Sequence, residues 1–85
     1  MIYELLLTRA AKKDREKIAL DSKRRVDEEL ALLALNPRHY GVEKLKGVHS
    51  LYRVRSGDYR IIFSIDDHNR SVEIARIIPR KDAYR

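Results

Sequence analysis

Cysteine is absent from this chain of 85 residues. Without thiols the protein cannot build a disulfide framework or a thiolate metal site, and the absence fits a reducing compartment. The three histidines, His39, His49 and His68, do not follow a spacing typical of metal ligands. The sequence therefore predicts neither a metal site nor any other bound cofactor.

Long hydrophobic runs are missing as well. No apolar stretch approaches the roughly 20 residues that a membrane span requires, and no signal-peptide pattern precedes the first apolar segment. We therefore expect a cytoplasmic protein that does not contact a membrane. The length predicts a single domain over residues 1–85, in which about 60 to 65% of the surface of the unfolded chain can be buried.

Glycine is scarce, and the three that are present do not form a Gly-rich phosphate-binding loop. A nucleophile elbow and a pair of carboxylates at a diagnostic spacing are also lacking. An enzyme built from this sequence would have to work mainly with arginine, lysine, tyrosine and an exposed histidine. His39 and His49 could carry protons near neutral pH, although ordinary loop histidines explain them more simply.

Positive charge is what the sequence has in excess. Nineteen Lys and Arg residues stand against thirteen Asp and Glu residues, which gives a net charge of +6. From Leu51 onward there are seven arginines and Lys81 against five acids. This balance favours a polyanionic partner, either nucleic acid or an acidic protein.

The order of apolar patterns predicts a small α+β domain. An apolar strand over residues 2–7 precedes Thr8, a candidate N-cap for a helix from Arg9 to about Leu20. Asp21 can cap a second helix that ends before Pro37, with Val26, Leu30, Leu33 and Ala34 on its buried face. A loop over residues 38–50, with Lys44 and Lys46 in a cationic patch, leads to three more strands over residues 51–55, 59–65 and 72–78. We expect the order β-α-α-β-β-β, with two N-terminal helices packed on one face of a twisted, mainly antiparallel four-stranded sheet.

The first two of these later strands predict a hairpin with one apolar and one cationic face. A two-residue turn at Ser56-Gly57 would place Arg53 opposite Arg60. It would put six side chains on the apolar face, namely Tyr52, Val54, Tyr59, Ile61, Phe63 and Ile65. Because opposed like charges destabilise a sheet, a face with Arg53, Arg55 and Arg60 is suited to an external anion such as RNA. The alternative is a set of surface arginines whose stems cover the sheet. The register of the last strand, and so the face of Arg76, stays open.

A short polar tail that contains Arg80, Lys81 and Tyr84 follows the last strand. A tyrosine in such a tail can stack on an RNA base or act through its hydroxyl group. Packing of Tyr84 at the edge of the core is equally compatible with the spacing.

Three segments of the chain, taken in order, resemble the RelE/ParE superfamily of toxin-antitoxin toxins. They are Tyr52-Arg-Val-Arg-Ser-Gly-Asp-Tyr-Arg60-Ile-Ile-Phe, then Val72-Glu-Ile-Ala-Arg-Ile77, and finally Arg80-Lys-Asp-Ala-Tyr84. The resemblance implies an endoribonuclease that acts in the ribosomal A site, where the ribose 2′-hydroxyl of the mRNA attacks the adjacent phosphate. It also implies a cognate antitoxin, the ribosome and mRNA as partners.

The resemblance also assigns site residues. Arg53, Arg55, Arg60, Arg80 and Tyr84 match the catalytic positions of the family motif, and Lys44, Lys46, Arg76 and Lys81 complete the expected RNA-binding surface. The chain departs from the motif in having arginine at 53 and 55, where relatives have lysine, and Pro79, where many have histidine. The general base is therefore unassigned. Two alternatives stay open, a ParE-like toxin that inhibits DNA gyrase without catalysis and a non-catalytic RNA-binding module.

Overall fold

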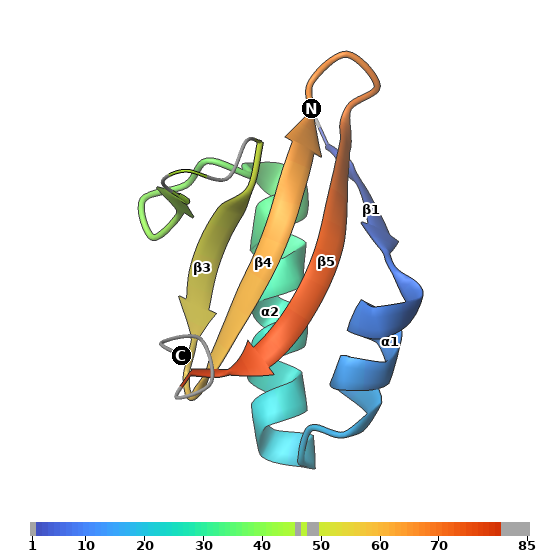
Figure 1. Cartoon of the computed structure of the whole chain (residues 1–85), viewed down its shortest axis with the longest axis vertical. Coiled ribbons are helices and arrows are strands. Elements are labelled where there is room, and N and C mark those ends of the chain that lie inside the picture. Colours follow the sequence, from blue (N-terminus) through green and yellow to red (C-terminus); the bar gives the residue numbers. More distant parts are fainter. Residues whose placement is uncertain (1, 46, 48–49, 81–85) are drawn as a thin grey trace.

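The computed structural model describes residues 2–45, 47 and 50–80. Within these residues, two helices and five strands follow one another along the chain (Figure 1). Their bounds are β1 Glu4–Leu7, α1 Arg9–Glu16, α2 Leu20–Leu35, β2 Glu43–Lys44, β3 Tyr52–Ser56, β4 Tyr59–Asp66 and β5 Ser71–Pro79. Neither helix within these ranges has the length and apolar character needed to cross a membrane.

All five strands form one mixed sheet in the order β1-β5-β4-β3-β2. β1 runs parallel to β5, and the other neighbours are antiparallel. The expected four-stranded sheet is therefore wrong, although the α+β class is correct. The missed strand, β2, has only two residues and lies inside the expected loop, so it carries no alternating pattern. The direction of β1 follows from tertiary pairing with a strand more than 60 residues away, which local sequence does not encode.

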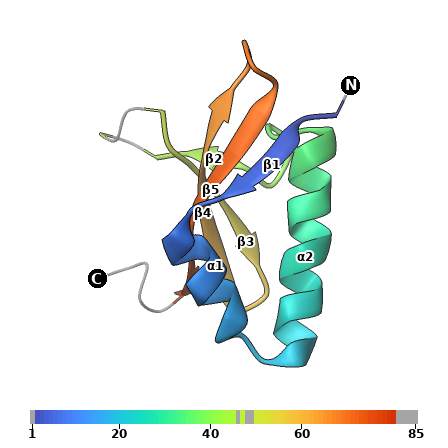
Figure 2. The same cartoon turned by 90° about the vertical axis from the view of Figure 1, so that its right-hand side faces the viewer.

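The hydrophobic core lies between the sheet and α2, which covers one face (Figure 2). Both helices contribute to it, α1 through Ala11 and α2 through Val26, Leu30 and Leu33. The strands add Val54, Ile61, Phe63, Val72, Ile74 and Ile77. The predicted apolar face is confirmed, because Tyr52, Tyr59 and Ile65 also pack against this cluster.

The helix boundaries are close to those predicted. The Ala11 backbone N–H donates to Thr8 Oγ1 at 3.1 Å, which confirms Thr8 as the N-cap of α1. α1 ends four residues earlier than expected, and α2 begins one residue before Asp21 with Ala19 as its N-cap. Asn36 is extended, with φ −154° and ψ 96°, as the following proline requires.

The β3–β4 hairpin differs from the prediction by a two-residue shift. Its turn is Gly57-Asp58, so Arg55 lies opposite Arg60 and Arg53 lies opposite Ile62. The predicted pairing of Arg53 with Arg60 is therefore wrong. Gly57 has a φ of +56°, which suits a hairpin turn with glycine at its first central position and leaves Ser56 in the strand. Because the shift is even, the side chains keep their predicted faces.

Candidate nucleic-acid interface

The sheet face opposite α2 carries the arginines of the hairpin. Residues on this open face follow from the register, in which Arg55, Arg60 and Ile78 lie side by side on β3, β4 and β5. Arg53 and Ile62 form the next row. Arg60 is only 7% exposed, whereas Arg55 is exposed. The hairpin therefore brings the cationic side chains of Arg55 and Arg60 together in one row of the open face.

A β-bulge in β5 brings one more arginine, Arg76, to the open face. Ile62 pairs with Arg76 but Phe63 pairs with Ile74, so Ala75 is the extra residue. The bulge shifts the alternation by one position, which keeps Ile77 in the core and places Arg76 and Ile78 on the open face. This answers the question that the sequence left open about Arg76.

Arg80 lies at the end of β5 beside the turn of the hairpin. Its backbone N–H donates to the carbonyl oxygen of Asp58 at 2.7 Å. Within the described ranges, the buried Nε atoms of Arg53 and Arg80 have no hydrogen-bond partner. A buried guanidinium donor without an acceptor is costly. Neither cost is offset by an acceptor within the described part of the chain.

Two of the arginines interact with carboxylates of the chain. Arg76 donates from Nε and Nη2 to the two oxygens of Asp14, at 2.7 and 3.0 Å. Arg53 Nη2 lies 3.8 Å from Glu43 Oε2, a weaker contact at the exposed β2 edge. Burial acts to raise the pKa of Asp14, but the hydrogen bonds from Arg76 and from the Ile77 N–H prevail and lower it. Asp14 therefore carries a full negative charge at neutral pH.

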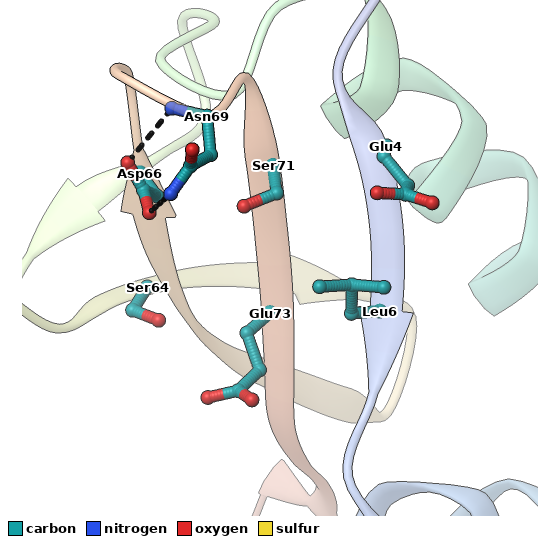
Figure 3. Close-up of a pocket in the computed structure, with 7 residues that line it drawn as sticks. All are labelled: Glu4, Leu6, Ser64, Asp66, Asn69, Ser71 and Glu73. Atoms are coloured by element: carbon teal, nitrogen blue, oxygen red, sulfur yellow. Dashed lines mark hydrogen bonds between the residues drawn. The ribbon is translucent and has the colours of Figure 1, made fainter.

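The other end of the open face is acidic. A pocket of about 390 Å³ lies where β1, β5 and β4 meet (Figure 3). It is lined by Glu4, Leu6, Ser64, Asp66, Asn69, Ser71 and Glu73. Along β4 the open face thus changes from Arg60 at the hairpin turn to Asp66 at the opposite end. This polarity predicts that a polyanion will bind only at the hairpin end.

Comparison with known proteins identifies the family. The model of a family described as the ParE toxin of type II toxin-antitoxin systems matches residues 5–84. The chain belongs to the RelE/ParE superfamily of toxins.

Named relatives and solved structures agree with this placement of the toxin. It is 38% identical over 50 residues to toxin RelE of Mycobacterium tuberculosis, covering 59% of this chain and 52% of that protein. It is 35% identical over 51 residues to toxin RelE3 of Methanocaldococcus jannaschii, covering 60% of this chain and 56% of that protein. Each match thus spans little more than half the length of the curated relative.

The fold of the toxin matches solved structures over nearly its whole length. The archaeal RelE-RelB complex from Pyrococcus horikoshii aligns with a TM-score of 0.80 and 29% identity, covering 94% of this chain and 97% of that one. The RelBE2 toxin-antitoxin complex from Mycobacterium tuberculosis aligns with a TM-score of 0.81 and 25% identity, covering 94% of this chain and 100% of that one.

Within the described ranges, the structure of the toxin brings together five of the predicted site residues and separates one. Arg53, Arg55, Arg60 and Arg76 share the open face, and Arg80 follows at its hairpin end. Lys44 is paired with Tyr52 in the register, so it lies on the side of the sheet that faces α2. Lys46, Lys81 and Tyr84 fall outside the described residues, and the roles assigned to all of these side chains remain predictions.

Sequence reasoning missed the part that α1 plays at this site. Thr8 and Asp14 hydrogen-bond to β5 at its bulge and just beyond it, although the sequence indicated only a helix with Thr8 as its cap. A signal was available, because Val72 and Ile74 alternate but the next core residue, Ile77, comes one position late. Such a break in a period of two indicates a bulge.

Proposed function

We propose that this toxin is a ribosome-dependent endoribonuclease that cleaves mRNA in the A site and is held inactive by a cognate antitoxin. The observation that carries the proposal is the arginine cluster at the hairpin end of the open face. Arginine presents a planar fork of donors that fits two phosphate oxygens and keeps its charge at every physiological pH. A cluster of this kind suits a substrate that gains negative charge during the reaction.

The reaction we assign is a transesterification within the RNA. The ribose 2′-oxygen forms a bond with the adjacent phosphorus, and the bond from that phosphorus to the 5′-oxygen of the next nucleotide breaks. The 2′-hydroxyl loses its proton to a base, and the 5′-oxygen gains one as it leaves. The products are a cyclic phosphate and a free 5′-hydroxyl, so no oxidant, metal or water enters the balance.

The arginines have separate roles in this proposal. Arg60 and Arg80 would stabilise the extra negative charge on the phosphate oxygens in the transition state, with one of them close to the leaving oxygen. Arg53 and Arg55 would hold the flanking phosphates and so orient the 2′-hydroxyl for attack. The placement of these arginines supports these roles, because Arg53, Arg55 and Arg60 share the open face and Arg80 lies beside the hairpin turn at its end.

The antitoxin partner rests on the family and on the relatives. Solved RelE proteins from Pyrococcus horikoshii and Methanococcus jannaschii are in complexes with RelB antitoxins. In this chain an acidic antitoxin segment would cover the arginine cluster and compete with mRNA for the same cations. Inhibition would then follow from occupancy of the site.

The proposal is tested by inducing the parent, Arg60→Ala and Arg80→Ala proteins in cells and mapping mRNA ends. We expect the parent to stop growth and to produce ends inside A-site codons, and each variant to cleave at least tenfold more slowly. Arg24→Ala, an exposed arginine on α2, is the matched control and should behave like the parent. Equal growth arrest by all four proteins without A-site ends would contradict the proposal.

A gyrase-directed toxin is the second candidate, favoured by the ParE description of the matching family model. Such a protein would bind DNA gyrase and trap it without chemistry of its own. Purified toxin would then inhibit supercoiling, and induced cells would show DNA damage with intact mRNA. The same arginine variants separate the candidates, because only the nuclease requires Arg60 and Arg80 for new RNA ends.

A further inference from the structure

Asp14 is a largely buried carboxylate that has no part in the proposed chemistry. It lies in α1, and only 12% of its side-chain surface is exposed. One of its oxygens, Oδ2, accepts hydrogen bonds from Arg76 Nε at 2.7 Å and from the Ile77 backbone N–H at 2.9 Å. The other oxygen accepts from Arg76 Nη2 at 3.0 Å. A single carboxylate therefore binds both the backbone and a side chain of β5.

These bonds replace a neighbouring strand along the outer edge of β5. β1 pairs with β5 only as far as Ile74. Beyond that point the Thr8 N–H donates to the Ile74 carbonyl at 3.1 Å, and Thr8 Oγ1 donates to the Ala75 carbonyl at 2.8 Å. Asp14 then accepts from Ile77. In Figure 1, α1 follows β1 along the same side of β5. Thr8 and Asp14 thus supply the edge bonds of the bulge and of Ile77, which follows it.

The bulge decides which side chains reach the open face. In an uninterrupted ladder, alternation from Ile74 would direct Arg76 and Ile78 toward the core and Ile77 away from it. With the bulge, Ile78 lies beside Arg60, and the chain continues to Arg80, whose N–H is bonded to Asp58. A group that fixes the bulge therefore fixes the position of Arg80 relative to Arg60.

We propose that Asp14 is a positioning residue for the arginine cluster: by holding the bulged segment of β5 through Ile77 and Arg76, it sets the geometry in which Arg60 and Arg80 act on one phosphate. The inference rests on the proposed nuclease function for its catalytic consequence. Loss of Asp14 would remove no cation from the open face, and it would free Arg76 from its carboxylate partner. It would disturb only the arrangement of the cations.

The first test is single-turnover cleavage of mRNA on programmed ribosomes by the parent, Asp14→Ala and Asp14→Asn. A misplacement of about 1 Å can cost on the order of 100-fold in rate, so we expect Asp14→Ala to lower the saturating rate 10- to 100-fold. The half-saturating concentration should change less than threefold. Asp14→Asn keeps an oxygen that can accept from the Ile77 N–H, so its saturating rate should lie between those of the parent and Asp14→Ala. If Asp14 only stabilised the fold, three folded proteins would be expected to cleave at the same rate.

A matched control loses another carboxylate-guanidinium pair of α1. Asp27 lies in α2, which covers the other face of the sheet, and accepts from Arg15 Nε and Nη2 of α1 at 2.8 and 2.6 Å. Asp27→Asn should therefore cleave at the rate of the parent. Parental rates for both Asp14 variants would overturn the inference, and so would an equal loss in Asp27→Asn.

A second test does not depend on cleavage. Binding of single-stranded RNA is measured for the parent, Arg80→Ala, Asp14→Asn and the double variant. If Asp14 positions Arg80, then Arg80→Ala should weaken binding less in the Asp14→Asn background than in the parent. A further outcome is that the parent fails to cleave mRNA while Arg80→Ala still has the smaller effect on binding in the Asp14→Asn background. In that case the proposed nuclease function is wrong, but Asp14 still positions Arg80 within an RNA-binding surface. Equal effects of Arg80→Ala in both backgrounds would refute the positioning role.

Discussion

Asp67 joins three segments that are far apart in the sequence. Its carboxylate accepts from Arg38 Nη1 and Nη2 at 3.0 and 2.8 Å and from the Tyr3 hydroxyl at 2.7 Å. The Arg38 guanidinium also lies 5.7 Å from the centroid of the Tyr52 ring. These contacts tie the N-terminus and the segment after α2 to the turn between β4 and β5.

We expect this carboxylate to make stability depend on acid pH. The hydrogen bonds from Arg38, and then from Tyr3, lower the pKa of Asp67 to about 2. Because the folded-state pKa lies below the unfolded value of about 3.9, the stabilisation is complete above about pH 4. It is lost as the pH falls from 4 toward 2. The melting temperature of Asp67→Asn should therefore lie below that of the parent at pH 7 and approach it near pH 2. A difference that stayed constant over this range would contradict the assignment.

The hairpin turn offers a second prediction for a single residue. Gly57 has a φ of +56°, a region that alanine enters only with strain. Gly57→Ala should therefore lower the free energy of unfolding by about 1 to 2 kcal/mol, measured by urea denaturation. The cause is the backbone, since an added Cβ would lie no closer than 3.7 Å to Arg25.

Gly41 provides the matched control for this substitution. An added Cβ would lie 3.5 Å from the His39 ring, an ordinary van der Waals contact, and its φ lies outside the left-handed region. Gly41→Ala should change stability by less than about 0.5 kcal/mol. Equal losses at both glycines would show that the φ of Gly57 is not the cause.

Leucines that are close together in the sequence of α2 differ strongly in how much of their side chain is buried. Leu33 is fully buried against the sheet, whereas Leu32 is 50% exposed and Leu35 is 61% exposed. Leu33→Ala should cost about 2 to 5 kcal/mol because it removes core contacts and leaves a cavity. Leu32→Ala should cost less than about 1 kcal/mol, since half of that side chain already contacts water. Urea denaturation of both variants provides the comparison, and similar losses would contradict the orientation of the helix.

The elements also show how far sequence reasoning could reach. The buried face of α2 and the boundary at Pro37 follow local rules, because apolar spacing and the proline ring act within a few residues. The faces of β3 and β4 follow from alternation alone, so they were correct even though Arg53 was paired with the wrong partner. The parallel pairing of β1 and the bonds from Thr8 and Asp14 to the bulged segment of β5 depend on contacts between segments more than 60 residues apart. Local patterns do not specify such contacts.

The same distinction holds for the candidate site. Arg55 and Arg60 could be grouped from the hairpin, because strand pairing is local there. The place of Arg76 required the bulge, and the bulge requires Thr8 and Asp14 from α1. Asp14, one of two acidic residues in the charged helix α1, gave no sign of its bond to Ile77. The arginines proposed to bind RNA were thus easier to predict than the groups proposed to position them.

At the scale of the whole molecule, the open face separates opposite charges along the strands. Arg55 and Arg60 lie at the hairpin end, and Glu4, Asp66 and Glu73 lie near the other end. A net charge of +6 would favour the approach of the proposed RNA substrate to the protein as a whole. The acidic end would repel the phosphates of RNA. The two ends together would therefore restrict where an RNA chain can bind and direct it to Arg60.

This polarity predicts how RNA binding depends on salt. Affinity for single-stranded RNA should fall linearly with salt on a double logarithmic plot, with a slope proportional to the number of phosphates contacted. Arg55→Gln should reduce the slope by roughly 0.7 to 1, because it removes one contact. Arg24→Gln removes the same charge from the exposed side of α2 and should leave the slope unchanged. Glu73→Gln removes only a repulsion, so binding should become tighter at low salt while the slope changes little. Equal slopes for Arg55→Gln and Arg24→Gln would mean that RNA responds to net charge rather than to the arginine cluster.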